Sequence, residues 1–376
     1  MTLGELPDYP WDQLTPYIER AKAHPAGAVD LSIGSPVDPT PEIVRTALRE
    51  HADAHSYPTT IGTNEARDAV VAWFARSRGV TGLERANTML TVGSKEFVAT
   101  AAFFLRLGVG DTVVYPSRAY PTYEIGAVFA GATGFASDDP AAWPESTKLI
   151  WLNSPGNPDG RVLGVEELRA AVDRARELGA VIINDECYAE LGWGDWAGER
   201  IPSILDERVN GGDFTNILAC SSLSKRSNLA GYRAAYIAGD SALISRLLVA
   251  RKHAGLMVPA PVQAAIAAAL GDDHHAVEQY NRYQRRRDAL LPALEAWGLR
   301  IEHSEAGLYL WGTKGDDSWT TIGELADLGI IGGPGVFYGE AGGRNVRVSL
   351  TATDDQVDEA ARRLYAASHD HSAKAQ

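Results

Sequence analysis

Cysteine is almost absent from this chain of 376 residues, which contains only Cys187 and Cys220. Two cysteines cannot build the disulfide framework of a small secreted domain, so we expect a reducing, cytoplasmic setting. Long apolar runs are missing as well, because no run reaches the ~20 residues that span a bilayer. Residues 1–10 lack the basic and apolar regions of a signal peptide. These absences argue against a membrane or secreted protein.

Positive charge is also scarce. Lys and Arg total 35 and Asp and Glu total 49, which gives a formal net charge of −14. An acidic chain repels phosphate backbones, so we expect no nucleic-acid partner. The nine histidines show no metal-ligand spacing, so no metal site is expected; His51, His55, His274 and His275 lie in polar surroundings and are expected at the surface.

The remaining composition is that of a soluble globular protein, with 45% hydrophobic and 22% charged residues. Between residues 35 and 270, apolar strand-like runs alternate with helical patterns, which is typical of a parallel sheet covered on both faces. We therefore predict a large, mainly parallel α/β/α domain over residues 35–270. The strand-like runs cover residues 88–92, 112–115, 149–152, 180–183, 216–220 and 234–238.

The two ends of the chain have a different pattern. Residues 271–376 combine a long helical pattern with strand-like runs at 307–311 and 345–350. Residues 1–34 are rich in proline and aromatic residues and show no clear element. We expect the two segments to form one smaller α+β domain.

Residues able to do chemistry follow the predicted strands. Gly93 and the residues after it stand between a strand and a helix, where free N–H groups suit a phosphate. The turn 153–160 contains two asparagines, and Asp185 ends an apolar strand. Lys225 follows the next strand, with Arg233 eight residues later. Ligands of open α/β sheets bind at the carboxyl ends of strands, so these side chains are expected to meet.

Each of these features alone has an ordinary explanation as a turn, a helix cap or a surface charge. Together they supply what pyridoxal 5'-phosphate (PLP) needs: anion donors, a stacking ring, a donor for the phenolic oxygen, a carboxylate for the pyridine nitrogen and an amine. The aromatic stretch at residues 120–123 would provide the ring.

Three motifs carry a resemblance to a known family. The segments 153–160 (NSPGNPDG), 185–188 (DECY) and 222–225 (SLSK, followed by Arg233) resemble those of fold-type I PLP-dependent aminotransferases of class I/II. The resemblance extends from residue 31 to residue 347. It implies a fold-type I transferase with a large PLP-binding α/β domain and a smaller α+β domain.

The resemblance also implies roles for individual residues. Lys225 matches the lysine that binds PLP covalently, Asp185 the partner of the pyridine nitrogen, and Tyr188, a third catalytic residue, donates with Asn157 to the phenolic oxygen. Tyr120 is similar to the aromatic residue that stacks on the ring. The residues that match the phosphate cradle are Ser94, Lys95, Ser222 and Arg233.

Other matches concern the partner subunit and the substrate. Tyr57 resembles a tyrosine that reaches the phosphate of the other subunit, which implies a homodimer with shared sites. Gly34, Asn157 and Arg347 match residues that bind the substrate, with Arg347 on the α-carboxylate. Asp159 stands where the family usually has threonine, and we expect no loss of function there.

The segment 222–233 is most similar to actinobacterial N-succinyl-LL-diaminopimelate aminotransferases. This implies transfer of an amino group from N-succinyl-LL-2,6-diaminopimelate to 2-oxoglutarate, giving N-succinyl-2-amino-6-oxopimelate and glutamate, in lysine biosynthesis. Such a substrate carries several carboxylates, for which Lys95, Arg118 and Arg226 are candidate partners.

Three alternatives stay open at this point. The chain could be another aminotransferase, for aspartate, an aromatic amino acid or N-acetylornithine. It could be a PLP-dependent lyase or decarboxylase, because the cofactor residues do not fix which bond breaks. A non-enzymatic PLP-binding regulator is disfavoured, since the chain has no spare length or basic charge for a DNA-binding module.

Overall fold

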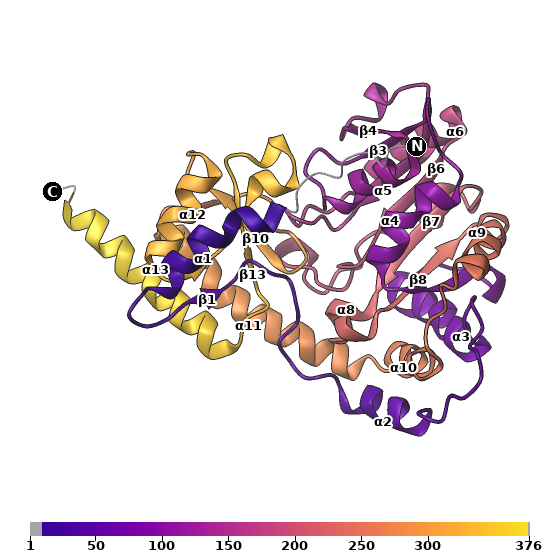
Figure 1. Cartoon of the computed structure of the whole chain (residues 1–376), viewed down its shortest axis with the longest axis horizontal. Coiled ribbons are helices and arrows are strands. Elements are labelled where there is room, and N and C mark those ends of the chain that lie inside the picture. The colour runs from indigo at the N-terminus through magenta and orange to yellow at the C-terminus, as the bar shows by residue number, and fades with distance from the viewer. Residues whose placement is uncertain (1–9, 375–376) are drawn as a thin grey trace.

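The apolar runs in the middle of the chain form one seven-stranded sheet (Figure 1). The computed structural model, which describes residues 10–374, confirms a mainly parallel sheet in which only β8 runs against its neighbours. In spatial order the strands are β2 (Thr88–Val92), β8 (Ala234–Gly239), β7 (Ile217–Ser222), β6 (Val181–Asp185), β5 (Thr147–Asn153), β3 (Thr112–Tyr115) and β4 (Thr133–Ala136).

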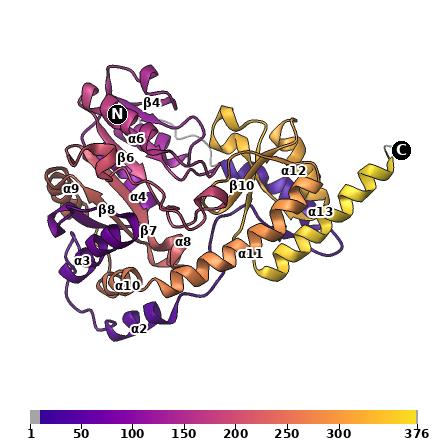
Figure 2. The same cartoon turned by 180° about the vertical axis from the view of Figure 1, so that it is seen from behind.

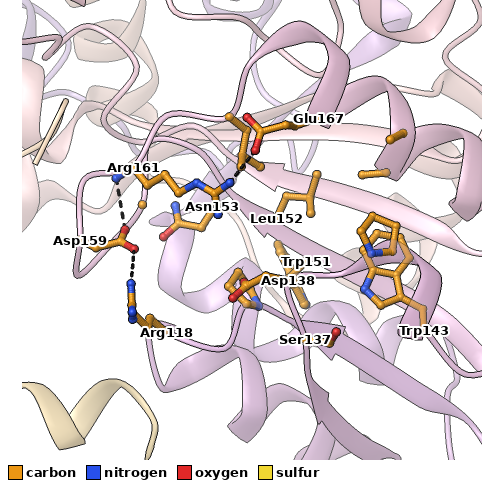
Figure 3. A pocket seen from close by; sticks show the side chains of 16 residues that line it. Arg118, Ser137, Asp138, Trp143, Trp151, Leu152, Asn153, Asp159, Arg161 and Glu167 are labelled. Carbon is orange, nitrogen blue, oxygen red and sulfur yellow. Dashed lines mark hydrogen bonds and ion pairs between the residues drawn. The ribbon is translucent and has the colours of Figure 1, made fainter. Parts of the chain in front are cut away.

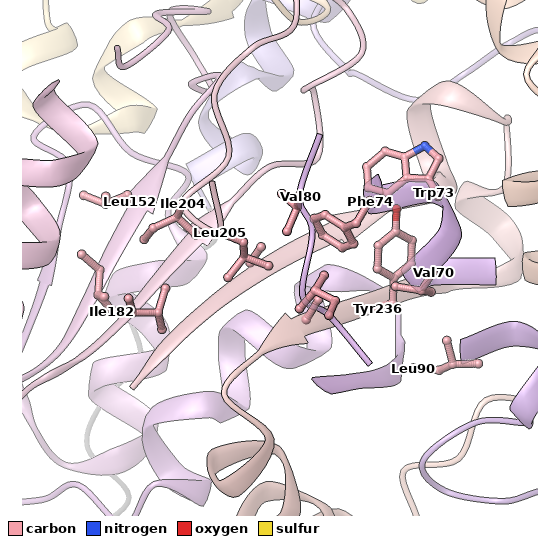
Figure 4. Close-up of a cluster of buried hydrophobic side chains, with 14 of the residues drawn as sticks. Val70, Trp73, Phe74, Val80, Leu90, Leu152, Ile182, Ile204, Leu205 and Tyr236 are labelled. Atoms are coloured by element: carbon pink, nitrogen blue, oxygen red, sulfur yellow. The ribbon is translucent and has the colours of Figure 1, made fainter. Parts of the chain in front are cut away.

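Successive strand residues point to opposite faces of this sheet, and each face has its own hydrophobic core. Met89 and Ile183 belong to one core, whereas their neighbours Leu90 and Ile182 belong to the other (Figure 4). The first core includes residues of α4 (Ser94–Phe104), α5 (Thr122–Ala130) and α9 (Ser241–Ala254). The second includes residues of α2 (Glu42–Glu50), α3 (Asn64–Trp73), α6 (Val165–Leu178), α7 (Glu207–Asn210), α8 (Leu223–Arg226) and α10 (Ala260–Gly271).

A third core holds the ends of the chain together. It lies around an antiparallel sheet of β12 (Gly333–Pro334), β13 (Val346–Ser349), β10 (Tyr309–Thr313) and β9 (Arg300–Ile301). The helices α1 (Thr15–Lys22), α12 (Ser318–Asp327) and α13 (Asp354–Lys374) pack around it, as does part of α11 (His274–Ala296). A short parallel pair, β1 (Val29–Asp30) with β11 (Ile330–Ile331), joins the N-terminal segment to this unit.

Among the elements that the sequence prediction did not contain are one helix and one strand. Residues 15–22, for which no element was expected, form α1, and Leu14 and Ala21 place its apolar side in the third core. The strand β4 was missed because Thr133–Ala136 is mostly exposed at the sheet edge and has no apolar run. The local sequence pattern does not predict α1 or β4, because tertiary packing determines both elements.

The long helix α11 (His274–Ala296) crosses from the large sheet to the small one (Figures 1 and 2). It contacts both halves, so the domain boundaries at residues 34 and 271 stay a prediction. Within residues 10–374, no helix combines the length and apolar character needed to cross a bilayer.

Candidate active site

Three neighbouring strands of the large sheet end in polar residues at the same edge. β5 ends at Asn153, β6 at Asp185 and β7 at Ser222. Asn153 pairs in register with Asp185, and its side-chain amide donates to the Asp185 carbonyl oxygen at 3.0 Å. Parallel strands bring their carboxyl ends to one edge, so motifs distant in sequence meet here.

Lys225 lies in the short helix α8, directly after β7. The hydroxyl of Ser222 caps this helix by accepting a hydrogen bond from the N–H of Ser224 at 3.1 Å. The half-buried amine of Lys225 donates to the main-chain carbonyl of Gly34. The lysine that follows β7 therefore contacts the segment that follows β1.

Asp185 is a buried carboxylate with neutral donors. The hydroxyl of Tyr123 and the N–H of Cys187 each donate to it at 3.1 Å. Burial raises the pKa of Asp185, because the negative charge has lost most of its solvation. A cationic group placed against this carboxylate would stabilise its charged form, and the protonated nitrogen of a pyridine ring is such a group.

An anion site is formed where α4 begins. Gly93 precedes the helix with φ 76°, and no side chain in residues 10–374 caps its first turn. A Cβ at Gly93 would overlap the guanidinium of Arg233, so this cation lies directly against the helix start. Uncapped N–H groups, the helix dipole and an arginine together suit a phosphate.

Two more of the predicted cofactor residues, Lys95 and Tyr120, lie near the start of α4. The amine of the exposed Lys95 is 5.7 Å from the centroid of the Tyr120 ring. Tyr120 packs edge-on against Tyr123, the residue that donates to Asp185. Tyr120 thus contacts Tyr123, the partner of the buried carboxylate, and lies near Lys95 in the first turn of α4.

Arg347 is a buried cation on β13, only 3% exposed. Its guanidinium donates to Oδ1 of Asn157 at 2.8 Å and to the carbonyl of Ser32 at 2.7 Å. Its Nε has no hydrogen-bond partner among the residues that the structure describes. Neither acceptor is a carboxylate, so the charge of Arg347 fits an anionic substrate group.

Tyr309, which no sequence motif indicated, links several of these residues. Its hydroxyl lies 3.3 Å from that of Tyr188, and the guanidinium of Arg347 is 3.9 Å from its ring centroid. A Cβ at Gly34 would overlap the Tyr309 hydroxyl, so only glycine fits there. Burial opposes ionisation of Tyr309, but Arg347 and Lys225 outweigh it and lower its pKa, whereas burial raises the pKa of Tyr188.

Tyr309 enters the site through the pairing of β10 with β13, which the sequence alone does not reveal. Trp311 stands opposite Arg347, and Tyr309 lies two residues from Trp311 on the same face of the sheet. Tyr123 was visible in the aromatic stretch, but only the fold brings its hydroxyl to Asp185.

The structure corrects the expectation for Arg226. Its guanidinium is 5% exposed and is bound by Glu190, and it also donates to the carbonyl of Ala269 at 2.9 Å. A second carboxylate, that of Asp273, lies 3.6 Å away. These bonds hold Arg226 in the interior beside α8, so it stabilises the packing there and is not a substrate contact.

Arg118 and Tyr57 remain accessible. One guanidinium nitrogen of Arg118 lies 3.8 Å from the carboxylate of Asp159, and 31% of the Arg118 side chain is exposed. Arg118 and Asp159 line a cavity of about 260 Å³ next to the turn 153–160 (Figure 3). Tyr57 is 93% exposed in the single chain, so it contributes to no site within that chain.

A mainly parallel α/β sheet with a lysine, a buried aspartate and an anion site at its carboxyl edge, together with the buried Arg347 of β13, defines a PLP-dependent transferase. The chain belongs to the class I and II aminotransferase family, whose model matches residues 26–364. Members of this family depend on PLP, and so does this chain.

Proteins of similar sequence align with most of the chain. The 4-dedimethylamino-4-oxo-anhydrotetracycline transaminase OxyQ of Streptomyces rimosus is 52% identical, covering 96% of this chain and all of its own length. Rv1178 of Mycobacterium tuberculosis, described as a probable aminotransferase, is 48% identical, covering 96% of this chain and 86% of its own. An LL-diaminopimelate aminotransferase of Gloeobacter violaceus is 31% identical, with 97% of both chains covered.

Solved structures have the same fold. An aminotransferase of Neisseria meningitidis superposes with a TM-score of 0.87 at 27% identity, covering 97% of this chain and 99% of its own. A probable N-succinyldiaminopimelate aminotransferase of Thermus thermophilus superposes with a TM-score of 0.84 at 27% identity, covering 95% of this chain and 99% of its own.

Proposed function

We propose that Lys225 binds PLP covalently and then moves the proton of the substrate Cα. The observation that carries this proposal is the contact of the Lys225 amine with the Gly34 carbonyl, together with the buried Asp185 at the end of the strand that pairs with β7. When bound, PLP supplies a carbonyl that condenses with amines and a protonated ring that accepts electrons. Lys225 then serves as base and as acid in turn.

The remaining cofactor residues hold the group in place. Asp185 keeps the pyridine nitrogen protonated, and Asn157 and Tyr188 donate to the phenolic oxygen. Tyr120 stacks on the ring, which fixes its plane. The phosphate is bound by Ser94, Lys95, Ser222 and Arg233, with the N–H groups at the start of α4.

Arg347 binds the substrate α-carboxylate. Its free Nε and its position over the Tyr309 ring support this role. A planar guanidinium binds a carboxylate through two parallel hydrogen bonds, which fixes the direction of the Cα–H bond relative to the ring. Because Gly34 has no side chain, it leaves room for the Tyr309 hydroxyl beside the bound substrate.

For the substrate we propose N-succinyl-LL-2,6-diaminopimelate, with 2-oxoglutarate as the amino acceptor. The diaminopimelate aminotransferases among the relatives and solved structures support this choice. The accessible cations Lys95 and Arg118 are the partners left for the distal carboxylates, since Arg226 is bound by Glu190.

A second candidate is supported by the OxyQ relative, whose substrate name describes a polycyclic ketone. Aromatic side chains stand next to Arg347, with Tyr338 at 4.7 Å from the guanidinium and Trp11 at 5.1 Å, by ring centroids, from Phe337. Such a wall would stack on a flat polycyclic substrate.

A panel of amino donors with 2-oxoglutarate tests these proposals by following glutamate formation. We expect N-succinyl-diaminopimelate to be the best donor. A polycyclic amine as the best donor would favour the second candidate. Release of pyruvate or carbon dioxide without any oxo acid would instead identify a lyase or a decarboxylase.

We also propose a homodimer with shared active sites in the cytoplasm. The supporting observation is the exposure of Tyr57, whose loop 51–59 contributes almost no buried side chain in the single chain. A partner subunit would bury this tyrosine at the phosphate.

A further inference from the structure

The buried face of α11 changes character along the helix. In its first half this face consists of His275, Gln279, Tyr283 and Arg286, each 6% exposed or less. In its second half the buried face is apolar, with Leu290, Ala293 and Leu294. Four polar side chains at spacings of four, four and three residues lie on one side of a helix. Burying them costs free energy unless each is bonded, so their partners indicate what the face does.

Three of these residues bind the segment that carries Lys225. The hydroxyl of Tyr283 donates to the main-chain carbonyl of Lys225 at 3.3 Å. The Ser227 hydroxyl lies 2.8 Å from Nε2 of His275, and the side-chain amide of Asn228 donates to Oε1 of Gln279 at 2.8 Å.

The proton positions follow from the partners of His275. Its Nδ1 lies 2.6 Å from the carboxylate of Asp272, so Nδ1 carries the proton and Nε2 accepts from the Ser227 hydroxyl. Burial lowers the pKa of His275 despite this carboxylate, which favours the neutral ring that such an arrangement needs. The expectation that His275 lies at the surface was therefore wrong.

The same face binds the segment that carries Gly34. The guanidinium of Arg286 donates to the two carboxylate oxygens of Asp38 at 2.6 and 2.9 Å, and the Gln279 amide donates to Asp38 at 2.8 Å. Asp38 is four residues from Gly34, whose carbonyl accepts from the Lys225 amine. Gln279 thus touches both segments at once.

We propose that this polar face of α11 is a positioning device that fixes the Lys225 segment and the Gly34 segment relative to each other, and so sets the place of the reactive amine. The inference rests on the proposed role of Lys225. Since α11 also continues into the small-domain core, the position of the lysine is tied to the seating of that domain on the large sheet. These α11 residues are positioning residues, because they act through Lys225 and Gly34.

The test compares two tyrosines of α11 that each donate one hydrogen bond to a main-chain carbonyl. Tyr283→Phe removes the bond to Lys225, whereas the control Tyr280→Phe removes a bond of 2.9 Å to Gly192, away from the lysine segment. Ser227→Ala removes another hydrogen bond of the same polar face, the one between Ser227 and His275. The holoenzyme variants are measured for kcat, KM, the visible absorbance of bound PLP against pH, and Tm.

We expect Tyr283→Phe and Ser227→Ala to lower kcat about three- to tenfold, the scale of one hydrogen bond, with KM changed less than about twofold. Both should shift the pH midpoint of the visible band, while Tyr280→Phe leaves kcat and the midpoint unchanged. Equal spectra and equal kcat for Tyr283→Phe and Tyr280→Phe would overturn the inference, whatever the change in Tm.

Borohydride reduction followed by peptide mapping separates this outcome from failure of the proposed function. If the label is on Lys225 while Tyr283→Phe and Tyr280→Phe have equal kcat and equal spectra, only the role of α11 is rejected. A label on another lysine rejects the role of Lys225 and the inference with it.

Discussion

The amine of Lys225 donates a hydrogen bond to the main-chain carbonyl of Gly34, although 191 residues separate them in the sequence. Gly34 in turn lies so close to the Tyr309 hydroxyl that a Cβ has no room. Lys225, Gly34 and Tyr309 therefore form one packed unit, in which the Tyr309 ring lies against the guanidinium of Arg347. A change at any of them is expected to reach the others.

Gly34→Ala tests this packing. A methyl group forced into a packed site costs about 1–3 kcal/mol, so kcat/KM should fall about 5- to 150-fold if Tyr309 must move. The control is Gly231→Ala, at a position where a Cβ meets nothing within 4 Å. Steady-state kinetics that give the same kcat/KM for both variants would contradict the tight fit.

Gly93→Ala tests the anion site. The new Cβ would displace the guanidinium of Arg233, so the Kd for PLP should rise about tenfold or more, as measured by absorbance titration of the apoenzyme. Gly82→Ala is the matched control, because Gly82 also has a positive φ, 84°, but open space around it. It should lower stability through backbone strain and leave PLP binding intact.

Asp185→Asn tests the buried carboxylate through stability. The folded-state pKa of Asp185 is raised, so the folded apoenzyme holds its proton longer than the unfolded chain does. Stability of the apoenzyme therefore falls as pH rises from about 4, the unfolded pKa, to the folded pKa. At pH 7.5 the Asp185→Asn apoenzyme should melt at or above the wild-type temperature.

The holoenzyme should behave in the opposite way. Bound PLP supplies a cation to Asp185, so PLP should raise the Tm of the wild type more than that of Asp185→Asn. Scanning calorimetry with and without PLP measures both differences. An equal gain in Tm for the two proteins would contradict the pairing of Asp185 with the ring nitrogen.

The three candidate cations should separate by substrate length. The distal carboxylates of N-succinyl-diaminopimelate lie ~8–10 Å from the reacting carbon. Loss of one charged contact is worth ~1.5–3 kcal/mol, so Arg118→Ala should lower kcat/KM about 10- to 150-fold for this donor and spare aspartate. Lys95→Ala also removes a proposed phosphate contact, so it should lower kcat/KM for both donors.

Arg226→Ala should instead destabilise the fold, by about 3 kcal/mol, because it leaves Glu190 without its partner. Denaturant unfolding measures this loss. If Arg226→Ala discriminated between long and short donors while keeping its stability, the structural role given to Arg226 would be wrong.

Mixing two defective subunits tests the shared site. Lys225→Ala is inactive and Tyr57→Phe is weakened, and a mixed dimer with shared sites contains one site with both defects and one with neither. Activity should therefore recover on mixing. Confirmed mixed dimers without recovery would place each site within one chain.

The sequence was informative where chemistry follows a local pattern. Asp185 and Lys225 come directly after apolar strands, and the parallel order of those strands brings them together without further information. Arg347 and the cofactor roles came from motifs that resemble a family, not from spacing. The position of Asp185 and Lys225 at strand ends could therefore be predicted from the sequence pattern, whereas the chemical roles came from the resemblance to the family.

Residues defined by distant pairing could not be predicted in this way. Tyr309 enters the site because β10 pairs with β13, and Arg226 leaves it because Glu190, 36 residues away, binds its guanidinium. His275 stands in a polar stretch typical of a surface helix, yet its partner Ser227 lies 48 residues earlier. A side chain's burial and partners depend on packing that no local window contains.

The most direct test of the account is the covalent attachment of PLP. Lys225 is one of seven lysines in the chain, so reduction of the holoenzyme with borohydride and peptide mass spectrometry can assign the label without ambiguity. The account predicts the reduced cofactor on Lys225 alone. A label on Lys95, whose amine lies near the Tyr120 ring, or on any other lysine would contradict it.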